Sequence, residues 1–121
     1  NILYARMAAM EDALDKIQSD SHTKELYEEL IGKITDFGKF EVERKKSSLH
    51  ISNGRAFLGV HPRSNGLLIS IVLDFKMPEE RTKKIEQVSK NRYHNEVLIT
   101  EVKEMDSSLL GFIHKAYALT S

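Results

Sequence analysis

The chain has 121 residues, equal numbers of basic and acidic side chains (18 each), 40% hydrophobic residues and no cysteine. This length allows one domain with its own core, and zero net charge excludes the general positive field that drives non-specific nucleic-acid binding. The absence of cysteine excludes disulfides and thiolate chemistry, and no apolar run approaches the ~18 residues of a membrane span, so we expect a cytoplasmic protein.

The first element is predicted to be a helix over residues 1–19, followed by a single domain over residues 20–121. Apolar residues at alternating steps of four and three would form one seam along this helix. The seam either packs on its own domain or pairs with a partner protein or a second copy of the chain. Its members are Leu3, Met7, Met10, Leu14 and Ile17.

The second element is predicted to be a helix that begins after the capping residues Ser19, Asp20 and Ser21. Its apolar stripe runs from Leu26 to Phe37. The alternation that follows, over residues 40–44, predicts a first strand.

Two Asn-Gly pairs, Asn53-Gly54 and Asn65-Gly66, interrupt alternating apolar residues between Ser48 and Phe75. Asn-Gly favours the positive φ angles of a type I′ turn, so the pattern predicts three antiparallel strands joined by two such turns.

These turns fix an expected register, in which Ile51 faces Ala56 and Val60 faces Ile71. Because side chains alternate with period two, aliphatic residues gather on one surface, which we expect beneath the helices. That surface comprises Leu49, Ile51, Ala56, Leu58, Val60, Ile69, Ile71 and Leu73. The opposite surface comprises His50, Arg55, Phe57, Gly59, His61, Arg63, Leu68, Ser70 and Val72.

The last third of the chain is predicted as a short exposed helix over residues 79–89, a polar loop over residues 90–95, a fifth strand from Val97 and a final helix after Asp106. The fold class is therefore α+β, a mainly antiparallel sheet of about five strands with N-terminal and C-terminal helices packed on one face.

The opposite surface gives the candidate site. Its basic and imidazole groups, around a glycine that a ligand could approach closely, suit an anionic or aromatic ligand. The alternative interpretation is that these residues belong to an ordinary, partly exposed sheet face that binds no ligand. The candidate ligand-binding residues are Lys46, His50, Arg55, Gly59, His61, Arg63 and His94.

Catalytic and metal-binding motifs are missing from the sequence. No histidine pair has metal-ligand spacing, and there is neither a nucleophile motif nor a glycine-rich phosphate loop, so we expect no metal and no cofactor. An enzyme would have to depend on His94 with Lys46 or Tyr117.

Scattered residues from Leu26 to Tyr117 resemble a known family. They are Leu26-Tyr27, Lys45-Lys46, Phe57 with Pro62, the strand from Gly66 to Leu73, His94 and Ala116-Tyr117. The chain resembles the prokaryotic domain of unknown function 5655, some members of which carry the label "predicted transport protein". The resemblance implies an α+β fold, a bacterial or archaeal origin and a position at the end of a longer protein, but no activity.

Three functions remain open at this stage. The first is a non-catalytic binding or interaction module. The second is a nucleic-acid- or anion-binding domain whose phosphate contacts would be Arg44, Lys45, Lys46, Arg55 and Arg63. The third is an enzyme centred on His94.

Overall fold

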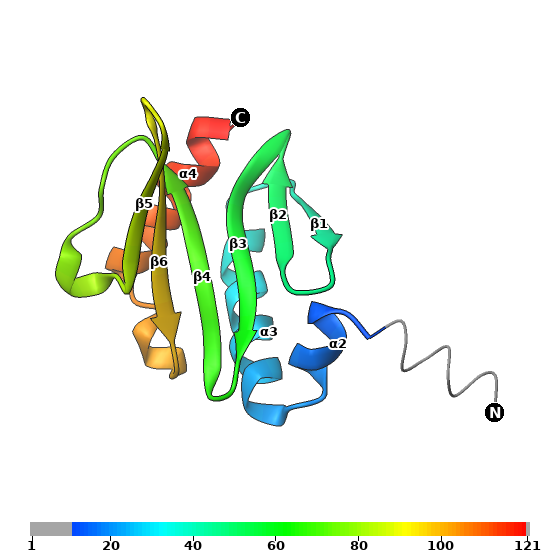
Figure 1. Ribbon diagram of the computed structural model, residues 1–121. Coiled ribbons are helices and arrows are strands. Elements are labelled where there is room, and N and C mark those ends of the chain that lie inside the picture. Colours follow the sequence, from blue (N-terminus) through cyan, green and yellow to red (C-terminus); the bar gives the residue numbers. More distant parts are fainter. Residues whose placement is uncertain (1–10, 121) are drawn as a thin grey trace.

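The computed structural model describes residues 11–120 as a six-stranded sheet with helices against one side (Figure 1). The strand order is β1-β2-β3-β4-β6-β5, and every neighbouring pair is antiparallel. The α+β class is confirmed, with one strand more than expected. The elements are α2 (Ala13–Gln18), α3 (Ser21–Thr35), β1 (Glu41–Arg44), β2 (Leu49–Asn53), β3 (Arg55–Arg63), β4 (Gly66–Leu73), the 3₁₀ helix η1 (Glu79–Arg81), β5 (Lys84–Ser89), β6 (Arg92–Ile99), the 3₁₀ helix η2 (Val102–Glu104) and α4 (Ser107–Thr120).

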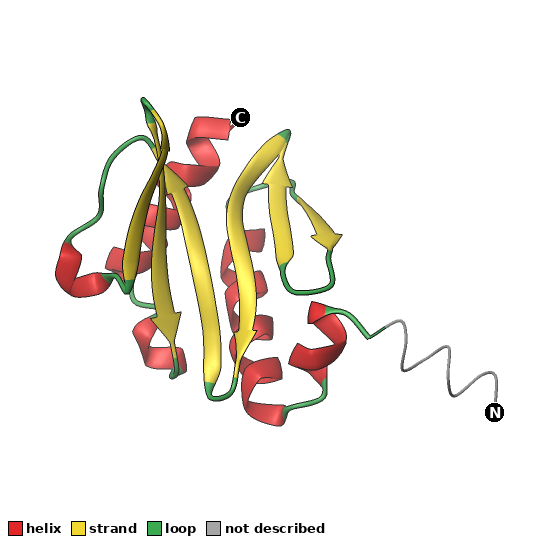
Figure 2. Cartoon of the chain, in the orientation of Figure 1, coloured by secondary structure: helices red, strands yellow, loops and turns green. Residues whose placement is uncertain are grey.

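Helices α3 and α4 both lie behind the sheet, and no helix among residues 11–120 covers its other face (Figure 2). Leu26 and Leu30 of α3 and Ile113 of α4 are at most 1% exposed, because the apolar stripe of each helix faces the strands. Within residues 11–120, none of these helices has the length and apolarity needed to cross a lipid bilayer.

The aliphatic surface expected from the sequence is the one beneath the helices. Seven of its eight members, all except Ala56, are 0–1% exposed. Burying each such side chain is worth about 1.5–3 kcal/mol, so this surface is a large part of the sheet's contribution to the core. The seven are Leu49, Ile51, Leu58, Val60, Ile69, Ile71 and Leu73.

Both reversals occur where the Asn-Gly pairs stand, but neither is a type I′ turn. Gly54 has a φ of 83°, whereas no residue other than glycine between positions 11 and 120 has a positive φ. Asn53 pairs with Arg55 and Arg63 pairs with Gly66, so each turn is displaced from its expected position. The type I′ prediction was wrong, because that turn requires positive φ at both central residues.

A β-bulge in β3 reverses the expected positions of two side chains. Ile51 pairs with Leu58 and Ser52 with Ala56, which leaves Phe57 as the extra residue. Phe57 is fully buried, and its ring meets that of Tyr117 in α4 edge-on at 5.2 Å. The predictions that Phe57 lies opposite the helices and that Ala56 lies in the core were therefore wrong.

Residues 79–95 also differ from prediction. Only Glu79–Arg81 is helical, as η1, and Lys84–Ser89 forms the edge strand β5. The expected polar loop is reduced to a tight turn, since β6 begins at Arg92. Strand β5 is mostly exposed, so it lacks the apolar alternation by which a strand is recognised.

Asn95 is the one fully buried polar side chain in the sheet (0% exposed) among the described residues. Its Oδ1 accepts the backbone N–H of Met77 at 2.9 Å. Its Nδ2 donates to the carbonyls of Ile71 and Phe75 at 3.2 and 3.3 Å. One amide therefore fixes the segment that leaves β4 against β6.

Helix α2 is attached to the first hairpin by a charge cluster. Asp12 accepts the backbone N–H of Asp15 and caps the helix, which begins at Ala13. Arg44 of β1 donates to both carboxylates at 2.9–3.1 Å. These hydrogen bonds, chiefly the one from Arg44, lower the pKa of Asp12 to about 2.

The predicted N-terminal seam is only partly within the described residues. Ile17 is fully buried and Leu14 packs against the core, so this part of the seam contacts its own domain. Leu3, Met7 and Met10 lie outside the described residues.

We predict that Gly66→Ala destabilises the fold. Gly66 begins β4 beside the end of β6, where an added Cβ would collide with the backbone carbonyl of Ile99. Because neither backbone can move freely, the free energy of unfolding in urea should fall by about 1–3 kcal/mol.

The matched control is Gly32→Ala, in the middle of α3. No atom lies within 4 Å of a Cβ added there. This variant should gain about 0.5–1 kcal/mol, because alanine loses less conformational entropy than glycine in a helix. Equal effects at the two positions would contradict the close approach of β4 to β6.

Candidate functional site

The sheet face that no described helix covers, called the open face below, holds most of the residues expected at the candidate site. In Figure 1 this face is turned toward the viewer. Strand pairing assigns its side chains, because residues that face one another across strands point to the same side. The residues of its centre are His50, Gly59, His61, Leu68, Ser70, Val72, His94, Glu96 and Leu98.

The middle row of the open face crosses four strands as His50, Gly59, Ser70 and Glu96. Gly59 has no side chain, and a Cβ there would lie 3.5 Å from that of Ser70 and 3.6 Å from Nε2 of His61. The two small residues thus make a shallow floor, and the imidazole of His61 lies at its edge.

Two of the three histidines on this face have lowered pKa values. Burial, followed by repulsion from Arg63, lowers the pKa of His61 below its ordinary 6.5. Burial, followed by repulsion from Arg92, does the same for His94. Both rings are therefore neutral at pH 7, where each presents one donor and one acceptor.

The basic residues of the candidate site do not converge. Arg55 and Arg63 are the first and last residues of β3, eight steps of about 3.3 Å apart, or about 26 Å. Lys46 lies beyond β1, in the turn that leads to β2. The structure thus brings His50, Gly59 and His61 together and separates Arg55, Arg63 and Lys46 from one another.

The residues proposed for an enzyme are not brought together either. Tyr117 lies on the helix side, where its hydroxyl donates to the carbonyl of Lys39 at 2.8 Å. Lys46 follows β1, four strand spacings of about 4.8 Å from β6, which carries His94. These distances exclude a shared reacting atom.

No group of three or more potential ligands could hold a metal ion within residues 11–120. The three histidines of the open face do not form a metal site, because they lie on β2, β3 and β6, with β4 between the last two. His94 would have to cross that strand to share an ion with His61.

Sequence reasoning missed Arg92 and Glu96, which lie on the open face at either side of His94. Residues 90–95 were predicted to be a loop, so the period-two rule was not applied to them. The pairs Val72–His94 and Ser70–Glu96 now place β6 beside β4. An alternating reading of residues 92–99 as one strand would have found both residues.

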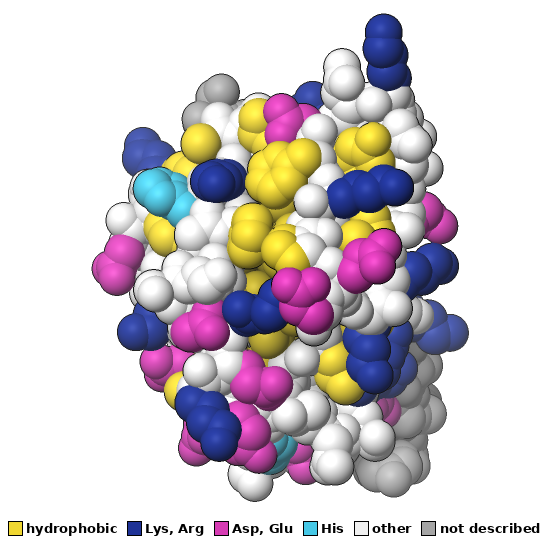
Figure 3. Space-filling model, turned by 90° about the vertical axis from the view of Figure 1, so that its left-hand side faces the viewer, with side chains coloured by type: hydrophobic (Ala, Val, Ile, Leu, Met, Phe, Trp, Pro, Cys, Tyr) yellow, Lys and Arg dark blue, Asp and Glu magenta, His cyan; other side chains and the backbone are white. Residues whose placement is uncertain are grey.

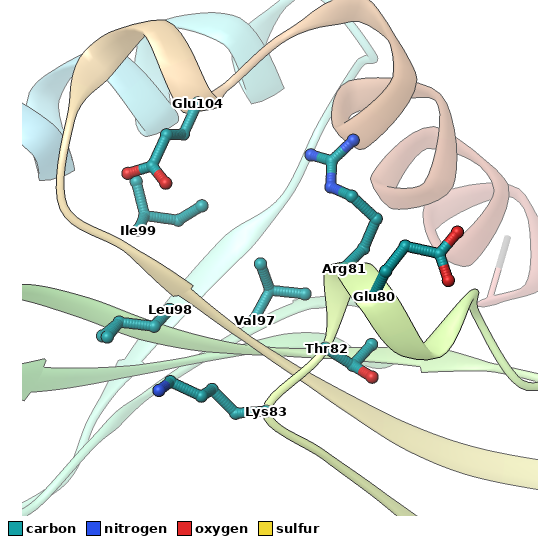
Figure 4. A pocket seen from close by; sticks show the side chains of 8 residues that line it. All are labelled: Glu80, Arg81, Thr82, Lys83, Val97, Leu98, Ile99 and Glu104. Carbon is teal, nitrogen blue, oxygen red and sulfur yellow. The ribbon is translucent and has the colours of Figure 1, made fainter.

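A hollow of about 380 Å³ lies beside the end of β6, between η1 and η2 (Figure 4). Two of its four charged side chains, those of Arg81 and Glu104, already have partners. Arg81 reaches Asp106 at 3.5 Å, and Glu104 accepts the backbone N–H groups of Thr100 and Glu101, both at 2.7 Å. Although burial opposes the shift, these hydrogen bonds lower the pKa of Glu104. The other two, Glu80 and Lys83, carry opposite charges, so the hollow favours an ion of neither sign.

The side of the molecule that carries β5 and η1 has no field of one sign. Figure 3 shows hydrophobic side chains there, surrounded by both basic and acidic groups. This mixture does not suit a nucleic-acid backbone, which attracts clustered positive charge.

A family model described as "Domain of unknown function (DUF5655)" matches residues 11–120. The chain belongs to this family. No curated protein and no solved structure matches it. The expected family membership is confirmed, and the match covers every element of the DUF5655 domain described above, from α2 to α4.

We predict that the two neutral histidines make this DUF5655 domain less stable in mild acid. Protonation is less favourable in the folded than in the unfolded chain, because both folded-state pKa values lie below 6.5. The stabilising contribution is fully present above this value and is lost as the pH falls from it through the folded-state pKa values.

Urea unfolding at about pH 7 and about pH 5 would measure the effect. The loss of unfolding free energy should be smaller in a variant with both His61→Gln and His94→Gln than in the native protein. Equal losses of unfolding free energy in the two proteins would show that the pKa values of these two rings are not lowered by folding.

Proposed function

We propose that this DUF5655 domain is a non-catalytic binding module that holds a partner protein against the open face of its sheet. The observation that supports the proposal is the composition of that face. An uncovered antiparallel face is normally solvated and polar. Here Leu68 and Leu98 are partly buried, Ser70 and Val72 are each 9% exposed, and no helix in the described part of the chain lies over them.

The charges on this face lie mainly toward its edges. Glu43 pairs with His50 from β1, and Lys84 and Glu86 pair with β6 from β5. Protein interfaces commonly have this arrangement, in which charged groups are depleted at the centre and form a polar rim. The neutral rings of His61 and His94 add hydrogen-bonding groups at little cost in charge desolvation.

A protein partner suits this face better than a nucleic acid does. The acidic residues Glu43, Glu86 and Glu96 lie among its basic groups, and Arg55 and Arg63 are too far apart to grip adjacent phosphates. The same comparison favours the open face over the N-terminal seam, since Ile17 is already buried in its own domain.

We also propose that the domain functions in the cytoplasm of a bacterium or archaeon. A chain without cysteine has no thiol to oxidise and suits a reducing compartment. The prokaryotic origin follows from the resemblance drawn from the sequence.

The test is to identify the partner and then disturb the centre of the face. A photoreactive amino acid at position 50 would cross-link the partner in the source cell, and titration calorimetry with the purified partner would give the affinity. Ser70→Arg, or Leu98→Glu as a milder change, should weaken binding at least about tenfold by placing an unpaired charge in the interface.

The matched control is Glu25→Arg on the exposed side of α3, which should leave the affinity unchanged. The proposal is wrong if Glu25→Arg weakens binding while both open-face variants bind normally. It is also wrong if no cross-linked protein binds the purified domain.

A further inference from the structure

Two arginines border one small hollow at the end of the sheet where β3 begins and β4 ends. Arg55 is the first residue of β3 and Arg92 the first of β6. The hollow measures about 120 Å³, and Asp74, Asn91, Val72 and Leu119 also contribute to its lining.

These two arginines differ from the others in the described part of the chain. Arg44 and Arg81 form ion pairs with carboxylates, and Arg63 donates to the carbonyl of Pro62 at 2.9 Å. The side chains of Arg55 and Arg92 make no ion pair or hydrogen bond within residues 11–120. The arginines that have no protein partner are thus the ones that share a hollow.

Arg92 shows this most clearly, because its Nε is shielded from water and has no hydrogen-bond partner. Nε2 of His94, two residues along the same face of β6, is in the same condition. Buried polar atoms nearly always have a partner, since leaving one unsatisfied is costly. A guanidinium donates only, so the group that would satisfy Arg92 is an acceptor.

Charge and size narrow the choice of acceptor. Two guanidinium groups and the carboxylate of Asp74 leave one net positive charge around the hollow. Arginine binds the planar or tetrahedral oxygens of carboxylate and phosphate through paired hydrogen bonds. Sites for drug-sized ligands are commonly about 300–1,000 Å³, so this hollow takes an anionic group and not a whole nucleotide.

We propose that Arg55 and Arg92 form a binding site for a single oxyanion group, a carboxylate or a phosphate. Arg92 supplies the shielded donor, and Arg55 supplies the second positive charge from the start of β3, on the other side of β4. Val72 and Leu119 provide apolar contact for whatever carries the anionic group. The site borders the proposed partner surface, with which it shares Val72 and Arg92, but it can be tested without any partner.

The test is a titration of the native domain followed by the Nε–Hε signals of its arginines in nitrogen–proton NMR spectra. Inorganic phosphate and acetate are added separately, with sodium chloride holding the ionic strength constant. The Arg92 and Arg55 signals should shift and saturate with at least one of the two anions. Saturation with phosphate alone would identify a phosphate site, and saturation with acetate alone a carboxylate site.

Arg92→Gln should weaken binding of the anion at least about tenfold, because it removes a charged hydrogen-bond donor. Arg63→Gln is the matched control, because it removes the same charge from the opposite end of β3 and should bind like the native protein. If Arg92→Gln fails to fold, Arg55→Gln replaces it, since Arg55 is exposed at the start of its strand.

The proposal is overturned if neither anion gives a saturable shift in the native protein. It is also overturned if Arg63→Gln weakens binding as much as Arg92→Gln does, because the effect would then be one of general charge.

Discussion

Leu58, Ile71 and Asn95 occupy facing positions on three adjacent strands, and all three are fully buried. One residue further along β3, Gly59 begins the row that Ser70 and Glu96 continue on the opposite side of the sheet. Because side chains alternate strictly, one register determines both rows. A slip of a single residue would expose the core and bury the polar groups of the open face.

Two local features adapt this register to the rest of the fold. The bulge at Phe57 turns an aromatic ring toward Tyr117 of α4 and leaves the smaller Ala56 on the open side. Asn95 satisfies the backbone of the segment after β4 and so allows that chain to leave the sheet while buried. Both features lie near the end of the sheet where Arg55 and Arg92 line one hollow.

The sequence predicted the sorting of side chains better than the turns that cause it. The expected facing pair Val60–Ile71 is actually Val60–Ile69, and Ile51 faces Leu58 instead of Ala56. Each error is a shift of two residues, which preserves the face because the side-chain period is two. The aliphatic surface was therefore correct in every member except Ala56, although both turn types were wrong.

The remaining errors have identifiable physical causes. Strand β5 is held mainly by pairing with β6, so its exposed sequence carries little sign of a strand. Missing β5 led to a loop in place of the start of β6, and this concealed Arg92. The bulge at Phe57 depends on a contact with α4, sixty residues away in the chain, which local periodicity cannot reveal.

The central claim is that the helices cover the aliphatic face and leave the histidine-bearing face accessible. A soluble gadolinium chelate, which broadens the NMR signals of accessible protons, tests this claim directly. The account predicts strong broadening of the ring signals of His50 and His61 and protection of those of Phe57. Protected histidine rings together with a broadened Phe57 ring would contradict the register and the site built on it.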